Sequence, residues 1–122
     1  MKTEADGLPK TGRSSRELGV RIDGPIVDLP VSSDGTVAPG TGGMSVAVDA
    51  ARNLPKPRLP RSLGGEGRDP VFTMFGGALP RVLCLRVDRH PHAFVEPASR
   101  GPLDGYESSL AATRPLWSKA YD

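Results

Sequence analysis

Residues 82–96 read "VLCLRVDRHPHAFVE", and this stretch carries the strongest strand signal in the chain. It consists of two apolar or β-branched runs, 82–87 and 92–96, on either side of the four-residue segment 88–91. Runs of this length bounded by Gly or Pro are typical of β-strands, and a short connection joins antiparallel neighbours. The stretch therefore predicts an antiparallel pair of strands with a turn at 88–91.

Residues before this pair show weaker strand signals. Residues 71–75, "VFTMF", form a further apolar run and predict a third strand. Residues 25–31, "PIVDLPV", are also a strand candidate, but the internal Pro30 cannot donate a ladder hydrogen bond and suits only an edge. Short strands are therefore expected upstream of the pair.

The pattern after the pair changes to a helical period. Four residues follow one another at intervals of three or four positions: Leu103, Tyr106, Leu110 and Thr113. This spacing predicts an amphipathic helix over 103–114, with Pro115 disturbing its end and Trp117 packing just beyond it. Strands followed by one terminal helix indicate a small α+β domain, built from short, mostly antiparallel strands and a C-terminal amphipathic helix.

The composition limits the size of the hydrophobic core and indicates loop-rich segments around it. The 122 residues include 15 Gly and 13 Pro, and 37% of them are hydrophobic. Such a chain supports one modest core with loop-rich margins. Residues 1–19 are polar and charged without periodicity, so we predict a mobile leader there and a single domain over 20–122.

Charge and cysteine content bear on the class of protein. The chain has 16 Lys and Arg against 14 Asp and Glu, and its arginines are scattered. No basic stripe with interleaved aromatic residues is visible, which argues against a nucleic-acid partner. The single Cys84 cannot form an internal disulfide, fits a reducing cytoplasm, and lies in an apolar run where burial is expected.

Targeting signals are also lacking in the sequence. No apolar run approaches the length of a membrane span, and the N-terminus has no hydrophobic region of a secretory signal. We therefore expect a cytoplasmic protein with no membrane partner, whose export would use no cleaved signal peptide.

The glycine-rich stretch "APGTGGMSVAVD", residues 38–49, is the first candidate site. It lacks the lysine of a nucleotide P-loop and the spacing of a dinucleotide fingerprint. Thr41, Gly42 and Gly43 could nevertheless present backbone N–H groups to a ligand, and Ser45 would add a hydroxyl. The alternative is a tight turn that only bends the chain.

The second candidate site lies on the strand over 92–96. Alternate residues of a strand share a face, so His92 and Glu96 can flank one pocket with Phe94 between them. Glu96 could act there as a general base or bind a ribose hydroxyl, and the alternative is an exposed glutamate at a strand end. A metal site on His90 and His92 with Asp88 is a further hypothesis, but no other strong ligand lies nearby.

Several blocks of the sequence, taken in order and spacing, resemble one family. The blocks are "DGTVAPGTGGMSV", "GRDPVF", "ALPRVLCLRVD", "HAFVEPA" and "PLDGYESSLAATRPLW". Together they are similar to the type VI secretion effector toxins known as type six effector two, over residues 18–119. The resemblance implies a fold like that of NAD-dependent ADP-ribosyltransferase toxins. It also implies growth arrest inside a recipient cell and neutralisation in the producer by a dedicated immunity protein.

The resemblance also implies site residues. The family's functional pair directly follows its double glycine, which corresponds here to Met44 and Ser45; Ser45 matches, and Met44 stands where the founding member has threonine. The family's first strand holds an arginine after an aromatic residue, and this chain has no such segment. Three explanations stay open: the start codon is misplaced, the domain is a fragment, or Arg21 takes over the role of that arginine.

The implied chemistry uses NAD. The glycine turn and Ser45 would hold its phosphates or nicotinamide ribose, and an arginine would neutralise its pyrophosphate. From the strand face, and not from the family, we assign Glu96 beside His92 to the ribose hydroxyl and to the positive charge that develops as nicotinamide leaves.

Two other functions compete with a toxin of ADP-ribosyltransferase type. One is a non-catalytic interaction module that keeps only the fold, which the missing arginine strand favours. The other is a small nucleic-acid-binding protein. For the toxin, the expected partners are the immunity protein and a component of the secretion machinery, and the expected destination is the cytoplasm of the recipient cell.

Overall fold

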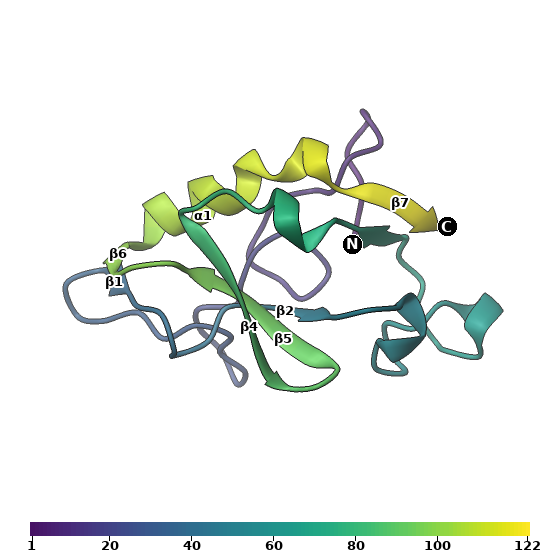
Figure 1. Ribbon diagram of the computed structural model, residues 1–122, viewed down its shortest axis with the longest axis horizontal. Helices are drawn as coiled ribbons and strands as arrows, with labels where there is room; N and C mark the ends of the chain where they lie inside the picture. Colours follow the sequence, from purple (N-terminus) through teal and green to yellow (C-terminus); the bar gives the residue numbers. More distant parts are fainter.

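Three small antiparallel sheets and one α-helix make up the computed structural model, which describes residues 1–122 (Figure 1). The strands are β1 (Thr36–Val37), β2 (Met44–Ala47), β3 (Val71–Thr73), β4 (Leu83–Arg89), β5 (His92–Pro97), β6 (Gly101–Pro102) and β7 (Ser118–Tyr121). The helix is α1 (Leu103–Ala112), and four 3₁₀ turns are η1 (Ala51–Asn53), η2 (Arg61–Leu63), η3 (Gly76–Ala78) and η4 (Arg114–Leu116). The prediction of a small α+β domain with mostly antiparallel strands and a C-terminal helix is confirmed.

The central sheet has the strand order β2-β5-β4. β4 and β5 form the predicted antiparallel pair, in a register that sets Leu85 opposite Val95. β2 pairs with the other side of β5 and sets Ser45 opposite Phe94. The segment that follows the glycine turn is therefore an edge strand of the same sheet that carries residues 92–97.

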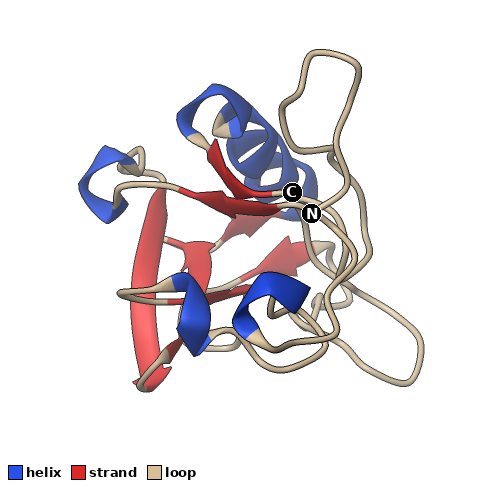
Figure 2. Cartoon of the chain, turned by 90° about the vertical axis from the view of Figure 1, so that its right-hand side faces the viewer, coloured by secondary structure: helices blue, strands red, loops and turns tan.

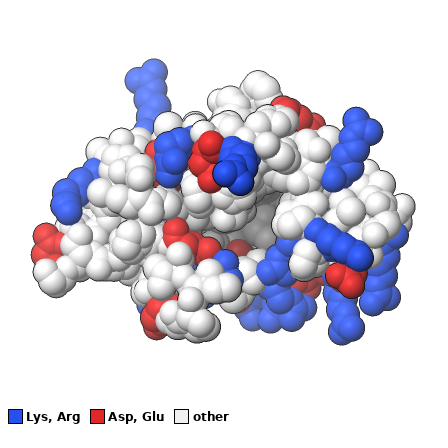
Figure 3. Space-filling model, turned by 90° about the horizontal axis from the view of Figure 1, so that it is seen from below, with Lys and Arg blue, Asp and Glu red and all other residues white.

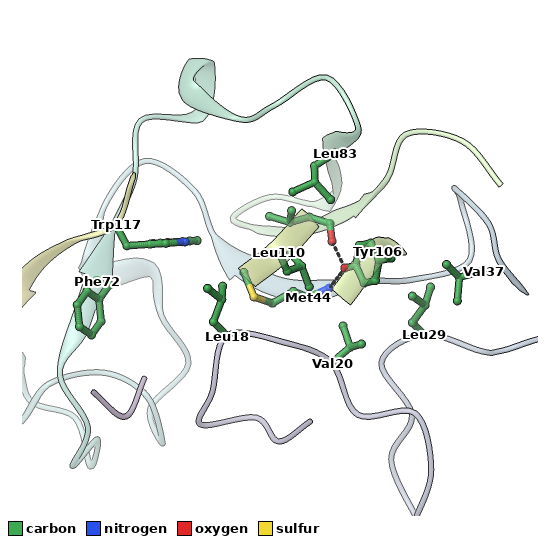
Figure 4. Close-up of a cluster of buried hydrophobic side chains, with 11 residues drawn as sticks. Leu18, Val20, Leu29, Val37, Met44, Phe72, Leu83, Tyr106, Leu110 and Trp117 are labelled. Atoms are coloured by element: carbon green, nitrogen blue, oxygen red, sulfur yellow. Dashed lines mark hydrogen bonds between the residues drawn. The ribbon is translucent and has the colours of Figure 1, made fainter. Parts of the chain in front are cut away.

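Helix α1 packs on one face of this sheet. Tyr106 and Leu110 are buried beside Met44 and Leu83, as Figure 4 shows, and Val95 belongs to the same core cluster. The predicted helical spacing is confirmed, since Tyr106, Leu110 and Thr113 are all buried. The helix ends at Ala112, and the turn η4 continues the chain to the buried Trp117, whose Nε1 donates to Thr113 Oγ1 at 3.0 Å.

The remaining strands form two small ladders. β3 covers the first part of the run at 71–75 and pairs with β7, which the sequence did not predict. β1 pairs with β6, and each of them has two residues. Residues 25–31 form no strand, because the segment contains Pro25 and Pro30 and pairs with no other strand; only Leu29 is fully buried there.

The N-terminal segment, residues 1–19, makes more contacts than its polar sequence suggests. Leu18 is fully buried in the core, and Pro9 is also among the fully buried side chains. Backbone hydrogen bonds join Lys2 to Arg16 and Lys10 to Leu18, so the segment folds back on itself. The prediction of a mobile leader did not consider that the apolar residues Pro9 and Leu18 are buried. The domain boundary at residue 19 stays a prediction.

Two further observations concern the surface. Cys84 is exposed and not buried as expected, because the neighbouring Leu83 occupies the inward-facing position of β4. No helix in the structure has both the length and the apolar character that a membrane crossing requires.

Candidate functional site

The central sheet has an outer face that α1 does not cover. Met44, Leu83 and Val95 point into the core, so the alternating positions of the same strands point outward. These positions are Ser45 and Ala47 on β2, Cys84, Arg86 and Asp88 on β4, and His92, Phe94 and Glu96 on β5. We call this set the outer face.

Aromatic and basic groups meet at the centre of the outer face. The rings of Phe94 and His92 pack edge to face with centroids 4.7 Å apart. The guanidinium carbon of Arg86 lies 5.0 Å from the centre of the Phe94 ring. Ser45 is exposed directly across from Phe94, so a hydroxyl, a ring and a guanidinium occupy neighbouring positions.

Glu96 connects the outer face to the glycine turn. Its side chain is only 6% exposed, and its Oε2 accepts hydrogen bonds from Arg86 Nε and from the backbone N–H of Gly40, both at 2.9 Å. A buried carboxylate requires such partners. Glu96 therefore holds the turn and the arginine in place, and it is neither an exposed strand-end residue nor free in a pocket.

The glycine turn is largely occupied by contacts within the protein. The N–H of Gly43 donates to Asp28 O at 2.9 Å, and the N–H of Met44 donates to Tyr106 Oη at 3.1 Å. A Cβ at Gly42 would lie 2.1 Å from Asp28 O, so the glycine allows two chain segments to touch. Together with the Gly40 bond to Glu96, these contacts use three N–H groups of the turn internally. Pro39, Gly40 and Thr41 are exposed at its tip.

Arg21 lies on the other side of the same turn. Its guanidinium forms a two-pronged contact with Asp28, at 2.8 and 3.0 Å, and its backbone N–H also donates to that carboxylate. The hydrogen bond raises the pKa of Arg21 further above its usual value. Because Asp28 O binds Gly43, an arginine–carboxylate pair supports each side of the turn: Arg21–Asp28 and Arg86–Glu96.

The two histidines each bind a different aspartate. His92 Nδ1 lies 2.6 Å from Asp88 Oδ1, and His90 Nε2 lies 2.6 Å from Asp49 Oδ2. The hydrogen bond with His92 holds the pKa of Asp88 below its usual value. No group of three or more His, Cys, Asp or Glu residues is placed to hold a metal ion.

The sequence-predicted residues are only partly brought together. Ser45, His92 and Glu96 share the outer face, whereas Gly42 and Gly43 are buried behind it and Arg21 is turned toward Asp28. Sequence reasoning missed Arg86 and Asp28. For Arg86 a signal was available, because it alternates with the apolar positions of its strand and therefore faces outward.

The side of the molecule away from α1 is uneven in charge. Figure 3 shows a hollow near its centre, with acidic atoms along one margin and basic side chains gathered at the right-hand end. That end corresponds to the turns η1 and η2 in Figure 1, within residues 51–68. Its cations, none of which takes part in an ion pair, are Arg52, Lys56, Arg58, Arg61 and Arg68, against the single carboxylate of Glu66. An anionic ligand would be attracted to this side.

Comparison of the chain with models of protein families, with curated proteins and with solved structures found no match.

Proposed function

We propose that this chain is a bacterial toxin of the NAD-dependent ADP-ribosyltransferase type, as its resemblance to the type six effector two family implies. One observation carries the proposal. Ser45, which directly follows the double glycine, is exposed on the outer face opposite Phe94. The only residue of the family's functional pair that matches here thus lies beside a ring and a guanidinium.

The chemistry of the outer face suits a dinucleotide. A flat heterocycle can stack on Phe94, whose ring is half-buried, and the guanidinium of Arg86 can bind an anionic phosphate. Ser45 would donate its hydroxyl to a ribose or phosphate oxygen. NAD would supply an ADP-ribosyl group, whose bond to nicotinamide breaks as an acceptor nucleophile takes the place of nicotinamide.

The residues of the glycine turn have a supporting role in this proposal. Because the N–H groups of Gly40, Gly43 and Met44 already have acceptors, the turn positions Ser45 and does not surround a phosphate. Glu96 is buried against Arg86, so its contribution is to orient that guanidinium. Arg21 stabilises the turn through Asp28.

The biological setting follows from the family resemblance alone. We propose that the toxin is made in the cytoplasm of the producer and is held inactive by an immunity protein. A component of the secretion machinery would then deliver it to the cytoplasm of a rival cell.

Expression inside bacteria tests the toxin proposal. The chain should slow growth, and Ser45→Ala should relieve much of this effect at equal protein level, because the hydroxyl of the outer face is lost. Ser33→Ala is the matched control, since Ser33 is an exposed serine in a turn outside the outer face. Equal toxicity of Ser45→Ala and the parent would contradict a role for the outer face.

A non-catalytic module that keeps only the fold is the second candidate. The observation in its favour is that Arg21 and most N–H groups of the glycine turn are bound within the protein. Release of nicotinamide from NAD by the purified chain separates the two candidates. Release that Ser45→Ala abolishes would establish the enzyme, and binding without release would favour the module.

A further inference from the structure

Strand β4 leaves one side of the central sheet open. β4 pairs with β5 only and forms the edge of the strand order β2-β5-β4. Figure 2 shows the outer strand of this sheet at the left, with its free side facing outward. Every second residue of an edge strand points its backbone N–H and C=O away from the sheet, where another strand can bind them.

Apolar side chains are exposed next to this open edge. Leu85 and Val87 lie on the same face of the sheet as the buried Leu83. They are 38% and 49% exposed, so the packing that buries Leu83 does not extend over them. Phe75 is 81% exposed, and a Cβ added at the neighbouring Gly76 would lie 3.8 Å from Leu85 Cδ2, so the chain passes close to Leu85 there. We call Phe75, Leu85 and Val87 the edge patch. Exposed apolar side chains beside an unpaired strand edge mark an interaction surface.

The charges that remain free along the edge are both positive. Within β4, Arg86 is paired with Glu96 and Asp88 with His92. Arg81 before the strand and Arg89 at its end are exposed, and neither takes part in an ion pair. A partner strand that pairs along β4 would therefore contact the apolar edge patch at its centre and an arginine without an ion pair at each end.

We propose that the edge of β4 binds an extended segment of another protein, in which apolar side chains alternate with carboxylates. The backbone of the segment would continue the sheet, its apolar residues would cover the edge patch, and its carboxylates would bind Arg81 and Arg89. A second copy of this chain is a poorer occupant. Antiparallel pairing of two β4 strands about their middle would bring Arg89 of one copy close to Arg81 of the other.

The charges make the proposal testable with short peptides. The probe is a capped seven-residue peptide of alternating valine and glutamate, and its matched control has lysine in place of glutamate. NMR titration of the full chain should show shifts of the backbone amides of residues 84–88, and their hydrogen exchange should slow. The glutamate peptide should bind about threefold to tenfold more tightly, since each exposed ion pair contributes modestly.

Two variants and one modified peptide make the test specific. Arg81→Glu combined with Arg89→Glu should reverse the preference between the two peptides, and Leu85→Ser should weaken both. A peptide with N-methyl groups at alternate residues should not bind, because it cannot continue the ladder.

Three results would overturn the proposal. They are unchanged amides at 84–88 with millimolar peptide, equal affinity for the two peptides, or equal binding of the N-methylated peptide. Sedimentation that shows a dimer of the free chain, lost in Leu85→Ser, would instead assign the edge to a second copy.

Discussion

Tyr106 links the helix by hydrogen bonds to two of the three strands of the candidate site. Its hydroxyl accepts the N–H of Met44 on β2 and donates to the carbonyl of Val95 on β5 (Figure 4). Burial raises the pKa of Tyr106 well above its usual value, so the hydroxyl stays protonated and can act as a donor. The position of Ser45, which follows Met44 directly, therefore depends on a residue far away in the sequence.

Replacing Tyr106 with phenylalanine tests this link. Tyr106→Phe keeps the ring but leaves the buried N–H of Met44 without its acceptor, so the free energy of unfolding should fall by about 1–3 kcal/mol. Urea denaturation measures the change. Tyr121→Phe is the control, since the Tyr121 hydroxyl makes no side-chain hydrogen bond and should contribute little. Equal stability of Tyr106→Phe and the parent would show that the hydroxyl does not hold β2.

The pairing of Glu96 with Arg86 can be measured by a double-mutant cycle. Glu96→Gln, Arg86→Gln and the double variant should give a coupling energy of about 0.5–1 kcal/mol, reduced because the arginine side chain is 35% exposed. If Glu96 acts by orienting Arg86, the losses of nicotinamide release in the single variants should also be non-additive. Additive losses would assign Glu96 a contact with the ligand of its own.

Elements with a local sequence signal could be predicted, and elements that depend on a distant partner could not. The hairpin of β4 and β5 and the helix α1 follow from runs and spacings within about 15 residues. β7 and the two-residue β1 and β6 exist because other segments pair with them. The candidate site shows the same division: the shared face of His92 and Glu96 is local, whereas the bond from Glu96 to Gly40 spans 56 positions.

The glycine turn is the element whose geometry most restricts its sequence. Gly42→Ala should lower the free energy of unfolding by about 3 kcal/mol, the upper end of overpacking costs, because its Cβ would lie 2.1 Å from Asp28 O. Gly40→Ala is the matched control. Gly40 has a φ of +77°, but no atom lies within 4 Å of the place that a methyl group would take, so only about 1 kcal/mol of backbone strain is expected. Thermal and urea unfolding compare the two, and equal losses would mean that the close approach to Asp28 is not required.

At the scale of the whole molecule, three exposed ion pairs join residues 1–19 to the rest of the chain. Arg13 binds Glu107 at 2.7 Å, Arg16 binds Asp69 at 2.7 Å, and Arg114 binds Asp6 at 3.0 Å. The N-terminal amine also donates to Pro70 O at 2.6 Å. These contacts join the polar N-terminal segment to α1, to η4 and to the loop before β3, so the attachment depends on charge as well as on the buried Leu18.

Asp69 is one of the carboxylates that make this attachment depend on pH. The hydrogen bond from Arg16 holds the pKa of Asp69 below its usual value, so the carboxylate stabilises the folded state above about pH 4, its ordinary pKa. That stability is lost as the pH falls through the lower folded-state pKa.

Asp69→Asn should therefore lower Tm by a few degrees at pH 7, since the Arg16 side chain is half exposed and the pair contributes under about 1 kcal/mol. The difference from the parent should shrink as the pH falls from 5 to 2. Asp122→Asn, at a 96% exposed side chain, should leave Tm unchanged at every pH. A difference for Asp69→Asn that persists at pH 2 would show that the variant acts through packing and not through the ion pair.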